Sequence, residues 1–134
     1  MKYEKYAKPL LRIGLSLVFL YFGFQQVLSP DDWAGFVPKY ALVFNLTANN
    51  LVMLNAVMEL TLVLFLIIGL YTRFSSIVLS LHLLGVAFSV GFNPIGIRDF
   101  GLAIATFVIF LNGLDNYCYD HLYNKGHIDK KIKE

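Results

Sequence analysis

The amino-acid sequence predicts an all-α integral membrane protein: a bundle of four transmembrane helices with the N-terminus and the C-terminus in the cytoplasm. Of its 134 residues, 57% are hydrophobic and only 15% are charged, whereas about 25% of the residues of a soluble domain are charged. The charged residues also divide the chain into four long apolar runs. These runs are apolar on every helical face, while transmembrane strands alternate apolar and polar residues. Helices are therefore expected, in a single domain over residues 1–134.

The first predicted helix covers residues 9–28. No charged residue lies between Arg12 and Asp31, and about 20 mostly apolar residues suffice to cross the hydrocarbon core. The basic start would also suit a secretory signal peptide, but the polar residues 29–32 follow without a small-residue cleavage site. We therefore expect a retained helix.

The connection over residues 29–50 is the only long one between predicted helices. Ser29 can cap a short helix that has Pro30 at its first position. A stripe of aromatic side chains at helical spacing follows, formed by Trp33, Phe36, Tyr40 and Phe44. Such a stripe suits a segment that lies in the membrane interface. Pro38 predicts that this segment is broken rather than one continuous helix.

Three further helices are predicted over residues 51–71, 75–92 and 100–114. The first of these is interrupted only by Glu59, and the second contains no Asp, Glu, Lys or Arg. The last is short, but it ends at Asn112-Gly113, which is a typical helix stop.

The orientation is predicted from the Lys and Arg residues, which concentrate on the cytoplasmic side of membrane proteins. With the N-terminus inside, the cytoplasmic set is Lys2, Lys5, Lys8, Arg12, Arg73, Lys125, Lys130, Lys131 and Lys133. The outer set is only Lys39 and Arg98. Both ends of the chain are therefore expected in the cytoplasm.

Several functional classes lack support in the sequence. Lys and Arg form no basic stripe, so no nucleic-acid partner is expected. Cys118 is the single cysteine, which excludes an intrachain disulfide and a Cys-x-x-Cys motif. Cys118, His121 and His127 match no zinc spacing, so no metal site is expected. Phosphate-binding loops and nucleophile motifs are missing, and no catalytic residue is assigned.

Glu59 is the residue that lipid would reject most strongly. Counted from residue 51 at about 1.5 Å per residue, it lies roughly 12 Å below the outer end of its helix. A carboxylate that faced lipid there would be costly, so Glu59 should face the bundle interior, be paired, or be protonated. Asn55 precedes it by one helical turn and shares its face.

Further polar residues fall in the outer half of the bundle. They are Gln26, Ser89, Arg98 and Asp99, with His82 deeper in the third membrane helix. Together with Asn55 and Glu59 they predict a polar pocket that opens outward and has His82 at its floor. Arg98 is the nearest cation for Glu59, and Asp99 is placed to cap the fourth helix.

A structural interpretation of the same residues stays open. Glu59 and Arg98 could form an ion pair that only fixes helix register, and His82 could be a helix–helix hydrogen-bond partner. Small residues would then serve close helix packing. The glycines concerned are Gly14, Gly23, Gly85 and Gly101.

Sequence motifs accompany the predicted helices. They are Leu11-Arg12, Gly23-Phe24-Gln25-Gln26, Glu59-Leu60-Thr61-Leu62-Val63-Leu64, Gly69-Leu70-Tyr71-Thr72-Arg73 and Ile97-Arg98-Asp99-Phe100-Gly101-Leu102. Over residues 9–114, this pattern resembles the DoxX family of small four-helix membrane proteins. The resemblance implies a four-helix membrane bundle in a prokaryotic plasma membrane.

The resemblance also implies a function, because members of the family are linked to quinone-coupled oxidoreductase assemblies, including thiosulfate oxidation, and to oxidative-stress complexes. Many members carry a lysine where this chain has Gln26, which leaves Arg98 as the only obvious cation near Glu59. Glu59 and Arg98 would hold a head group, with His82 as a proton relay. The ligand-binding set is then Gln26, Asn55, Glu59, His82, Arg98 and Asp99.

Three functions stay open at this point. The leading hypothesis is a membrane subunit of a quinone-linked redox system, which binds a quinone or lipid head group in the outward pocket. The alternatives are a non-catalytic scaffold or assembly factor, and an oligomeric transporter of a small solute or of protons. The sequence has no haem, iron–sulfur or flavin pattern, so a quinone is the one cofactor considered and enzyme status stays open. Expected partners are the lipid membrane and a second copy or redox proteins.

Overall fold

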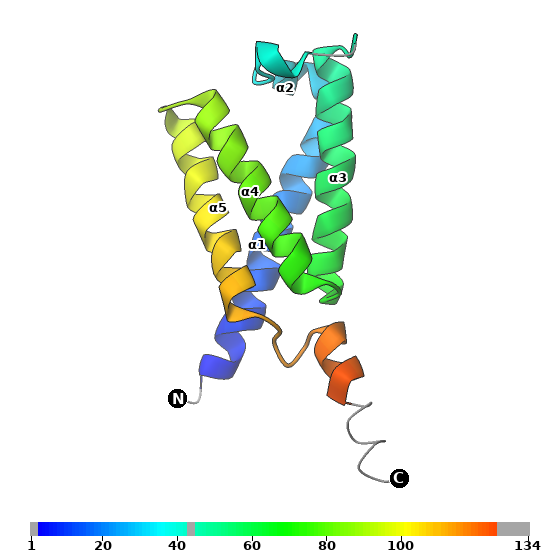
Figure 1. Cartoon of the computed structure of the whole chain (residues 1–134), viewed down its shortest axis with the longest axis vertical. Coiled ribbons are helices and arrows are strands. Elements are labelled where there is room, and N and C mark those ends of the chain that lie inside the picture. The colour runs from blue at the N-terminus through cyan, green and yellow to red at the C-terminus, as the bar shows by residue number, and fades with distance from the viewer. Residues whose placement is uncertain (1–2, 43–44, 126–134) are drawn as a thin grey trace.

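The structure is a computed structural model and describes residues 3–42 and 45–125. Its elements are α1 (Glu4–Leu28), α2 (Pro30–Ala34), the 3-10 helix η1 (Lys39–Ala41), α3 (Ala48–Ile68), α4 (Thr72–Val90) and α5 (Pro94–Asn112), shown in Figure 1. A further helical segment, residues 119–125, ends the described chain. The described residues contain no strand. The expected all-α fold is confirmed, and α1, α3, α4 and α5 are each long and apolar enough to cross a membrane.

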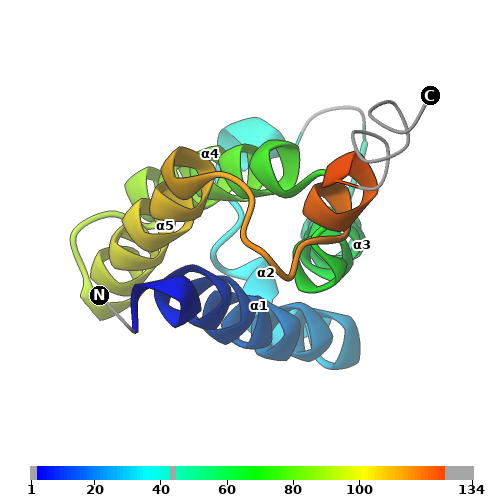
Figure 2. The ribbon, with the colours of Figure 1, turned by 90° about the horizontal axis from the view of Figure 1, so that it is seen from below.

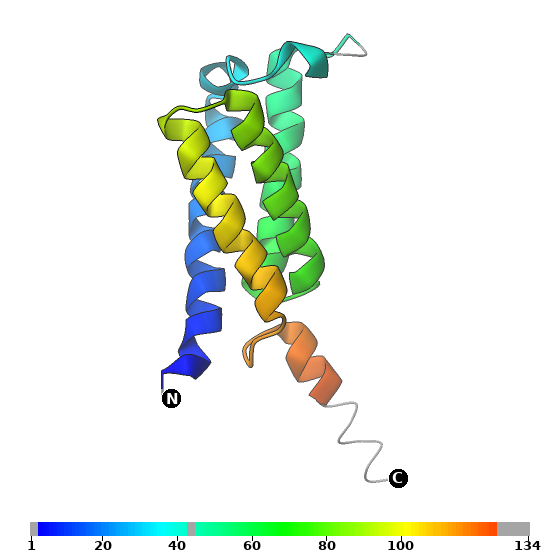
Figure 3. The same cartoon turned by 60° about the vertical axis from the view of Figure 1, so that its left-hand side comes forward.

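The four long helices form two antiparallel pairs. Helix α4 packs mainly against α5, and α1 packs mainly against α3. The pairs converge at the end where the described chain starts and finishes, and they spread toward the end that carries α2 (Figure 1). Figure 3 shows α2 and the connecting segment lying across that end of the bundle. Viewed from the converging end, the helices surround a common centre (Figure 2). We call this the termini end and the opposite one the loop end; which of them faces the cytoplasm stays a prediction.

The fourth transmembrane helix begins at Pro94, earlier than the expected start at residue 100. Asn93 caps it, because its side-chain oxygen accepts hydrogen bonds from the backbone N–H groups of Ile95 and Gly96 at 3.0 and 2.9 Å. The expectation that Asp99 caps this helix is therefore wrong. Proline suits the first helical position, so the Asn93-Pro94 pair sets the start and Asp99 falls within the helix.

The turn between α3 and α4 depends on Gly69. This residue has φ +78°, a left-handed conformation that glycine adopts without steric cost. A Cβ atom here would also lie only 2.5 Å from the Cα atom of Cys118. The glycine therefore ends α3 and lets the segment after α5 pack against the turn.

The connection between α1 and α3 is broken, as expected, with α2 and η1 on either side of the break. Two side-chain hydrogen bonds hold it over the loop end: Asn49 donates to Asp31, and the hydroxyl groups of Tyr40 and Ser89 lie 2.7 Å apart. The expected aromatic stripe ends at Phe44, which lies outside the described residues.

The core lies on the inward faces of the four helices. Its fully buried members include Val63, Leu66 and Leu79. Gly23 permits close packing of α1 on α3, because a Cβ atom there would lie 2.7 Å from the Leu60 side chain. The same role was expected for Gly14, Gly85 and Gly101, but no neighbouring atom lies within 4 Å of a Cβ built at those positions.

Arg12 joins three parts of the chain at the termini end. Its Nε donates to Asp115 Oδ2 at 2.7 Å, and its Nη1 donates to the backbone oxygens of Leu66 and Ile67. Those carbonyls lie at the end of α3, where a helix leaves acceptors without intrahelical partners. Arg12 was expected only as a basic residue flanking the membrane, yet it is 3% exposed. It therefore ties α1 to α3 and to the segment after α5.

Asp115→Asn should strongly destabilise the bundle, because it leaves the Arg12 guanidinium buried without a counter-charge. Breaking a buried ion pair typically costs about 3–5 kcal/mol. The loss would be measured as the change in the free energy of unfolding in mixed micelles. The exposed Lys8, which donates to the Asn112 carbonyl at 3.0 Å, supplies the control. Lys8→Gln should cost about 0.5 kcal/mol or less. Equal losses for the two variants would contradict the proposed role of the pair.

The ion pair also predicts a pH dependence of stability. Burial raises the pKa of Asp115, but hydrogen bonds from Arg12 and from the Tyr117 N–H, with the charge of Arg12, lower the pKa below its ordinary value of 3.8. A pKa depressed by folding stabilises the protein above the unfolded-state value, and this stabilisation is lost as the pH falls through the folded-state pKa. The stability gap between the unmodified chain and Asp115→Asn should therefore be constant near neutral pH and shrink below 3.8. A gap that widens on acidification would contradict this.

Candidate functional site

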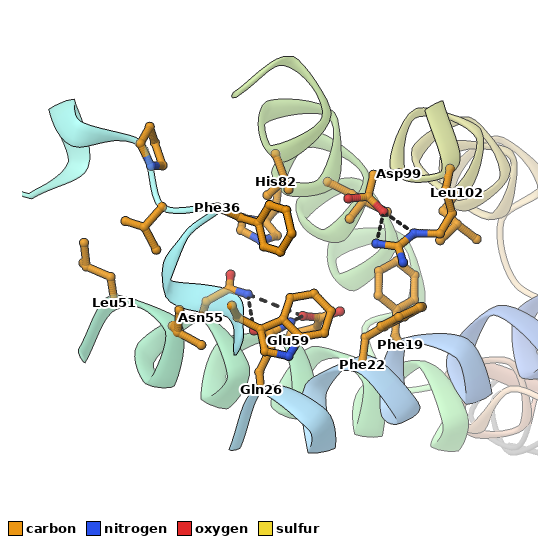
Figure 4. A pocket seen from close by; sticks show the side chains of 17 residues that line it. Phe19, Phe22, Gln26, Phe36, Leu51, Asn55, Glu59, His82, Asp99 and Leu102 are labelled. Carbon is orange, nitrogen blue, oxygen red and sulfur yellow. Dashed lines mark hydrogen bonds and ion pairs between the residues drawn. The ribbon is translucent and has the colours of Figure 1, made fainter. Parts of the chain in front are cut away.

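A pocket of about 200 Å³ lies between the helices toward the loop end (Figure 4). All four long helices contribute to it, and residues 33 and 36–38 of the connection between α1 and α3 line it as well. Its polar lining consists of Gln26, Asn55, Glu59, His82, Arg98 and Asp99. The structure thus brings together the six residues that the sequence singled out as a candidate ligand site.

Glu59 forms the centre of a hydrogen-bonded group with two amide side chains. Gln26 Nε2 donates to Glu59 Oε2 at 3.1 Å, and Asn55 Nδ2 lies 3.5 Å from the same oxygen. Asn55 Nδ2 also donates to Gln26 Oε1 at 2.8 Å. The amide orientations are therefore mutually consistent. One residue of α1 and two of α3 form this group, which fixes these two helices against each other.

The carboxyl group of Glu59 has a polar environment without a counter-charge. The residue is 4% exposed, and no ion pair to it occurs among the described residues. Both amide contacts use Oε2, and Oε1 has no hydrogen-bond partner within the described part of the chain. A carboxyl oxygen that lines a pocket and lacks a protein partner is available to a ligand.

Arg98 pairs with its neighbour Asp99 instead of with Glu59. Its Nε and Nη2 atoms lie 2.8 and 2.7 Å from Asp99 Oδ1, and its guanidinium carbon lies 4.3 Å from the centre of the Phe22 ring. The Glu59–Arg98 ion pair that the sequence left open as one interpretation is therefore not formed between these described residues. The reason is helix rotation: Asp99 is 5% exposed on the inner face of α5, while Arg98 is 36% exposed beside it and extends over α1.

His82 and Ser89, both on α4, differ in their relation to the pocket. The His82 ring lines it and makes no hydrogen bond to any described residue, so the helix–helix hydrogen bond considered for it is not formed in this part of the chain. Ser89 is exposed and bonds to Tyr40 of the connecting segment instead. Ser89 therefore holds that segment rather than contributing to the pocket.

Aromatic residues complete the pocket, and the sequence reasoning missed them as lining residues. They are Phe19, Phe22, Trp33 and Phe36. The rings of Phe22 and Trp33 meet edge to face, with their centroids 5.9 Å apart. The aromatic stripe after α1 could have indicated this pocket wall. It did not, because rings at helical spacing are expected both for a segment in the membrane interface and for a segment that covers a pocket.

The pocket can bind a small planar or polar group at its inner surface. Apolar rings provide most of the wall, and a few polar side chains converge on it, which is the usual composition of a ligand site. No group of three or more His, Cys, Asp and Glu side chains suited to a metal ion occurs within the residues that the structure describes. His127 of the tail lies outside those residues.

These features define a four-helix integral membrane protein with a buried carboxyl group at an internal pocket. The DoxX family model matches residues 7–91, which is more than half of the chain, and the protein belongs to that family. The match covers α1 to α4, and a prokaryotic plasma membrane is in keeping with it. No curated protein and no solved structure matches the chain.

Removing Gln26 should destabilise the bundle through Glu59. Gln26→Leu takes away the closer of the two amide donors, and a hydrogen bond to a charged or buried polar group contributes about 1–3 kcal/mol. Gln25 is a matched control, because among the described residues its side chain bonds only to the Tyr21 hydroxyl, at an exposed position. Gln25→Leu should change the free energy of unfolding by about 0.5 kcal/mol or less. A loss at Gln25 as large as that at Gln26 would contradict the proposed network.

Proposed function

We propose that this protein is a membrane subunit of a quinone-linked redox system and that its pocket binds the head group of a quinone or a similar lipid. The observation that carries the proposal is the composition of the pocket: aromatic walls, with Glu59 and His82 among a few convergent polar side chains. Such sites are typical for small ligands that carry both ring and polar atoms. The family resemblance, through its link to quinone-coupled assemblies, supports the same function.

The size of the pocket favours a head group over a whole lipid. Pockets that enclose a complete small ligand usually measure about 300–1,000 Å³, whereas this one measures about 200 Å³. A ring with its polar substituents suits this volume, and a long apolar tail would have to remain outside. The surrounding hydrocarbon is the natural place for such a tail, because the pocket lies between helices that span the membrane.

The side chains in the pocket suit the polar atoms of a quinone. Ring carbonyls need hydrogen-bond donors, which the Arg98 guanidinium and the His82 ring can supply. The reduced ring carries hydroxyl groups, for which Glu59 Oε1 is an acceptor. A bound quinone would supply a carrier of electrons and protons. Glu59 and His82 can accept or release protons beside it, whereas the carboxylate of Asp99 is paired with Arg98.

Electrons must then come from another protein. The sequence contains no haem, iron–sulfur or flavin ligation pattern, so the proposal assigns this chain the quinone site and assigns the redox centre to a partner subunit. The pocket lies at the loop end, and the lysine-rich termini end is proposed to face the cytoplasm. The site would then open toward the outer side of the membrane.

Quinone binding can be followed through Trp33, the single tryptophan of the chain, which lines the pocket. A short-chain ubiquinone analogue should quench its fluorescence saturably in nanodiscs. Glu59→Gln should weaken binding of the reduced, ubiquinol form of the analogue about tenfold, because its ring hydroxyl groups then donate to an amide oxygen, which is a weaker acceptor than a carboxylate oxygen. Asp32→Asn is the control, since Asp32 is exposed next to Trp33 and does not line the pocket.

The outcomes separate the proposal from its alternatives. Quenching that rises linearly with quinone, as for free tryptophan, would contradict a binding site at the pocket. Equal saturable binding by Glu59→Gln and the unmodified chain would contradict the role of Glu59. A scaffold instead predicts that Glu59→Gln mainly lowers the thermal unfolding midpoint. A Glu59-dependent transporter predicts loss of flux in liposomes, which the redox proposal does not require.

A further inference from the structure

A second cavity lies at the termini end, away from the pocket described above. It is an open groove of about 700 Å³ between the turn that joins α3 to α4, the end of α5 and the helical segment 119–125. Its volume falls within the range of about 300–1,000 Å³ that is typical for small-ligand sites. The groove shares no lining residue with the Glu59 pocket, so an inference about it does not depend on the proposed function.

The groove contains one basic and one acidic side chain that are not paired with each other. Arg73 and Asp120 both line it, yet among the described residues neither of these two side chains forms an ion pair or a hydrogen bond. The backbone N–H of Asp120 donates to the Gly69 carbonyl at 3.2 Å, which fixes that residue against the α3–α4 turn. A separated cation and anion in one groove form a two-point site for a ligand with charges of both signs.

Gly113 provides space for the guanidinium group of Arg73. A Cβ atom built on this glycine would lie 2.7 Å from Arg73 Nη2 and 3.1 Å from Nε. The guanidinium therefore lies against the backbone just after α5, and a larger residue at position 113 would displace it. Arg73 nevertheless remains exposed, so that a ligand can reach it.

The groove lies at the level where phospholipid head groups are expected. Arg73 is the second residue of α4 and Asn112 is the last residue of α5, and both helices have the length and composition of membrane spans. Tyr71 and Tyr123 also line the groove, and tyrosine is enriched at the boundary between hydrocarbon and water. A molecule in this groove can thus keep its acyl chains in the bilayer.

We propose that the groove binds the head group of a phospholipid with a primary ammonium, namely phosphatidylethanolamine. Arg73 would bind the phosphate, because the guanidinium group offers several donors to phosphate oxygens. Asp120 would accept hydrogen bonds from the ammonium. An anionic head group satisfies only Arg73 and is repelled by Asp120, while a choline head group has no N–H to donate.

Native mass spectrometry of the full chain tests this, with phosphatidylethanolamine, phosphatidylcholine and phosphatidylglycerol of identical acyl chains added in equal amounts. The unmodified protein should retain phosphatidylethanolamine preferentially. Asp120→Asn should reduce that preference over phosphatidylglycerol about fivefold, the size of an exposed ion pair of about 1 kcal/mol. Arg73→Gln should reduce the binding of all three lipids.

Matched controls distinguish a site from general attraction of lipid by charged residues. Lys125 is exposed on the same helical segment and does not line the groove, and Asp32 is exposed at the other end. Lys125→Gln and Asp32→Asn should leave the lipid preference unchanged. The proposal is overturned if Lys125→Gln lowers lipid binding as much as Arg73→Gln, or if Asp120→Asn keeps the original preference. Thermal unfolding of each variant shows whether it is folded.

Discussion

The structure depends on the requirement that polar groups within a bilayer be satisfied by the protein itself. Arg12 meets this requirement at the termini end, where it bonds to Asp115 and to the last carbonyls of α3. Glu59 meets it nearer the loop end through Gln26 and Asn55. The two groups differ in one respect: Arg12 has a counter-charge, whereas the partners of Glu59 within the described part of the chain are amide donors. The first arrangement suits a permanent connection, while the second leaves a carboxyl oxygen for a ligand.

This difference matches the shape of the bundle. The Arg12 contacts hold α1, α3 and the segment after α5 together where the two helix pairs converge. Toward the loop end the pairs spread. The connection between α1 and α3 lies across that end and lines the pocket with Trp33 and Phe36. The contacts at the termini end thus stabilise the bundle, and the loop end can hold a pocket. The same fold can therefore be stable and still contain a buried polar site.

Much of this could be predicted from the sequence. Charge-free runs identify the spans, and Glu59 stands out because lipid rejects it. The partners of the charged side chains could not be predicted, because the rotation of each helix about its axis depends on its packing. Arg98 therefore pairs with adjacent Asp99 rather than with Glu59. The partners Arg12 and Asp115 are 103 residues apart, and neither position has a local pattern that predicts the contact. The start of α5 was not predicted either. Asn93 caps this helix, which therefore begins at Pro94 rather than at residue 100.

The most direct test of the account is to identify what the Glu59 pocket holds in the native membrane. The protein would be extracted gently into nanodiscs and every small molecule that co-purifies with it identified by mass spectrometry, in parallel with Glu59→Gln. We expect a stoichiometric quinone in the unmodified protein and its loss in the folded variant. A stoichiometric partner protein without any quinone, or a quinone retained equally by both proteins, would contradict the central claim that Glu59 forms part of a quinone site.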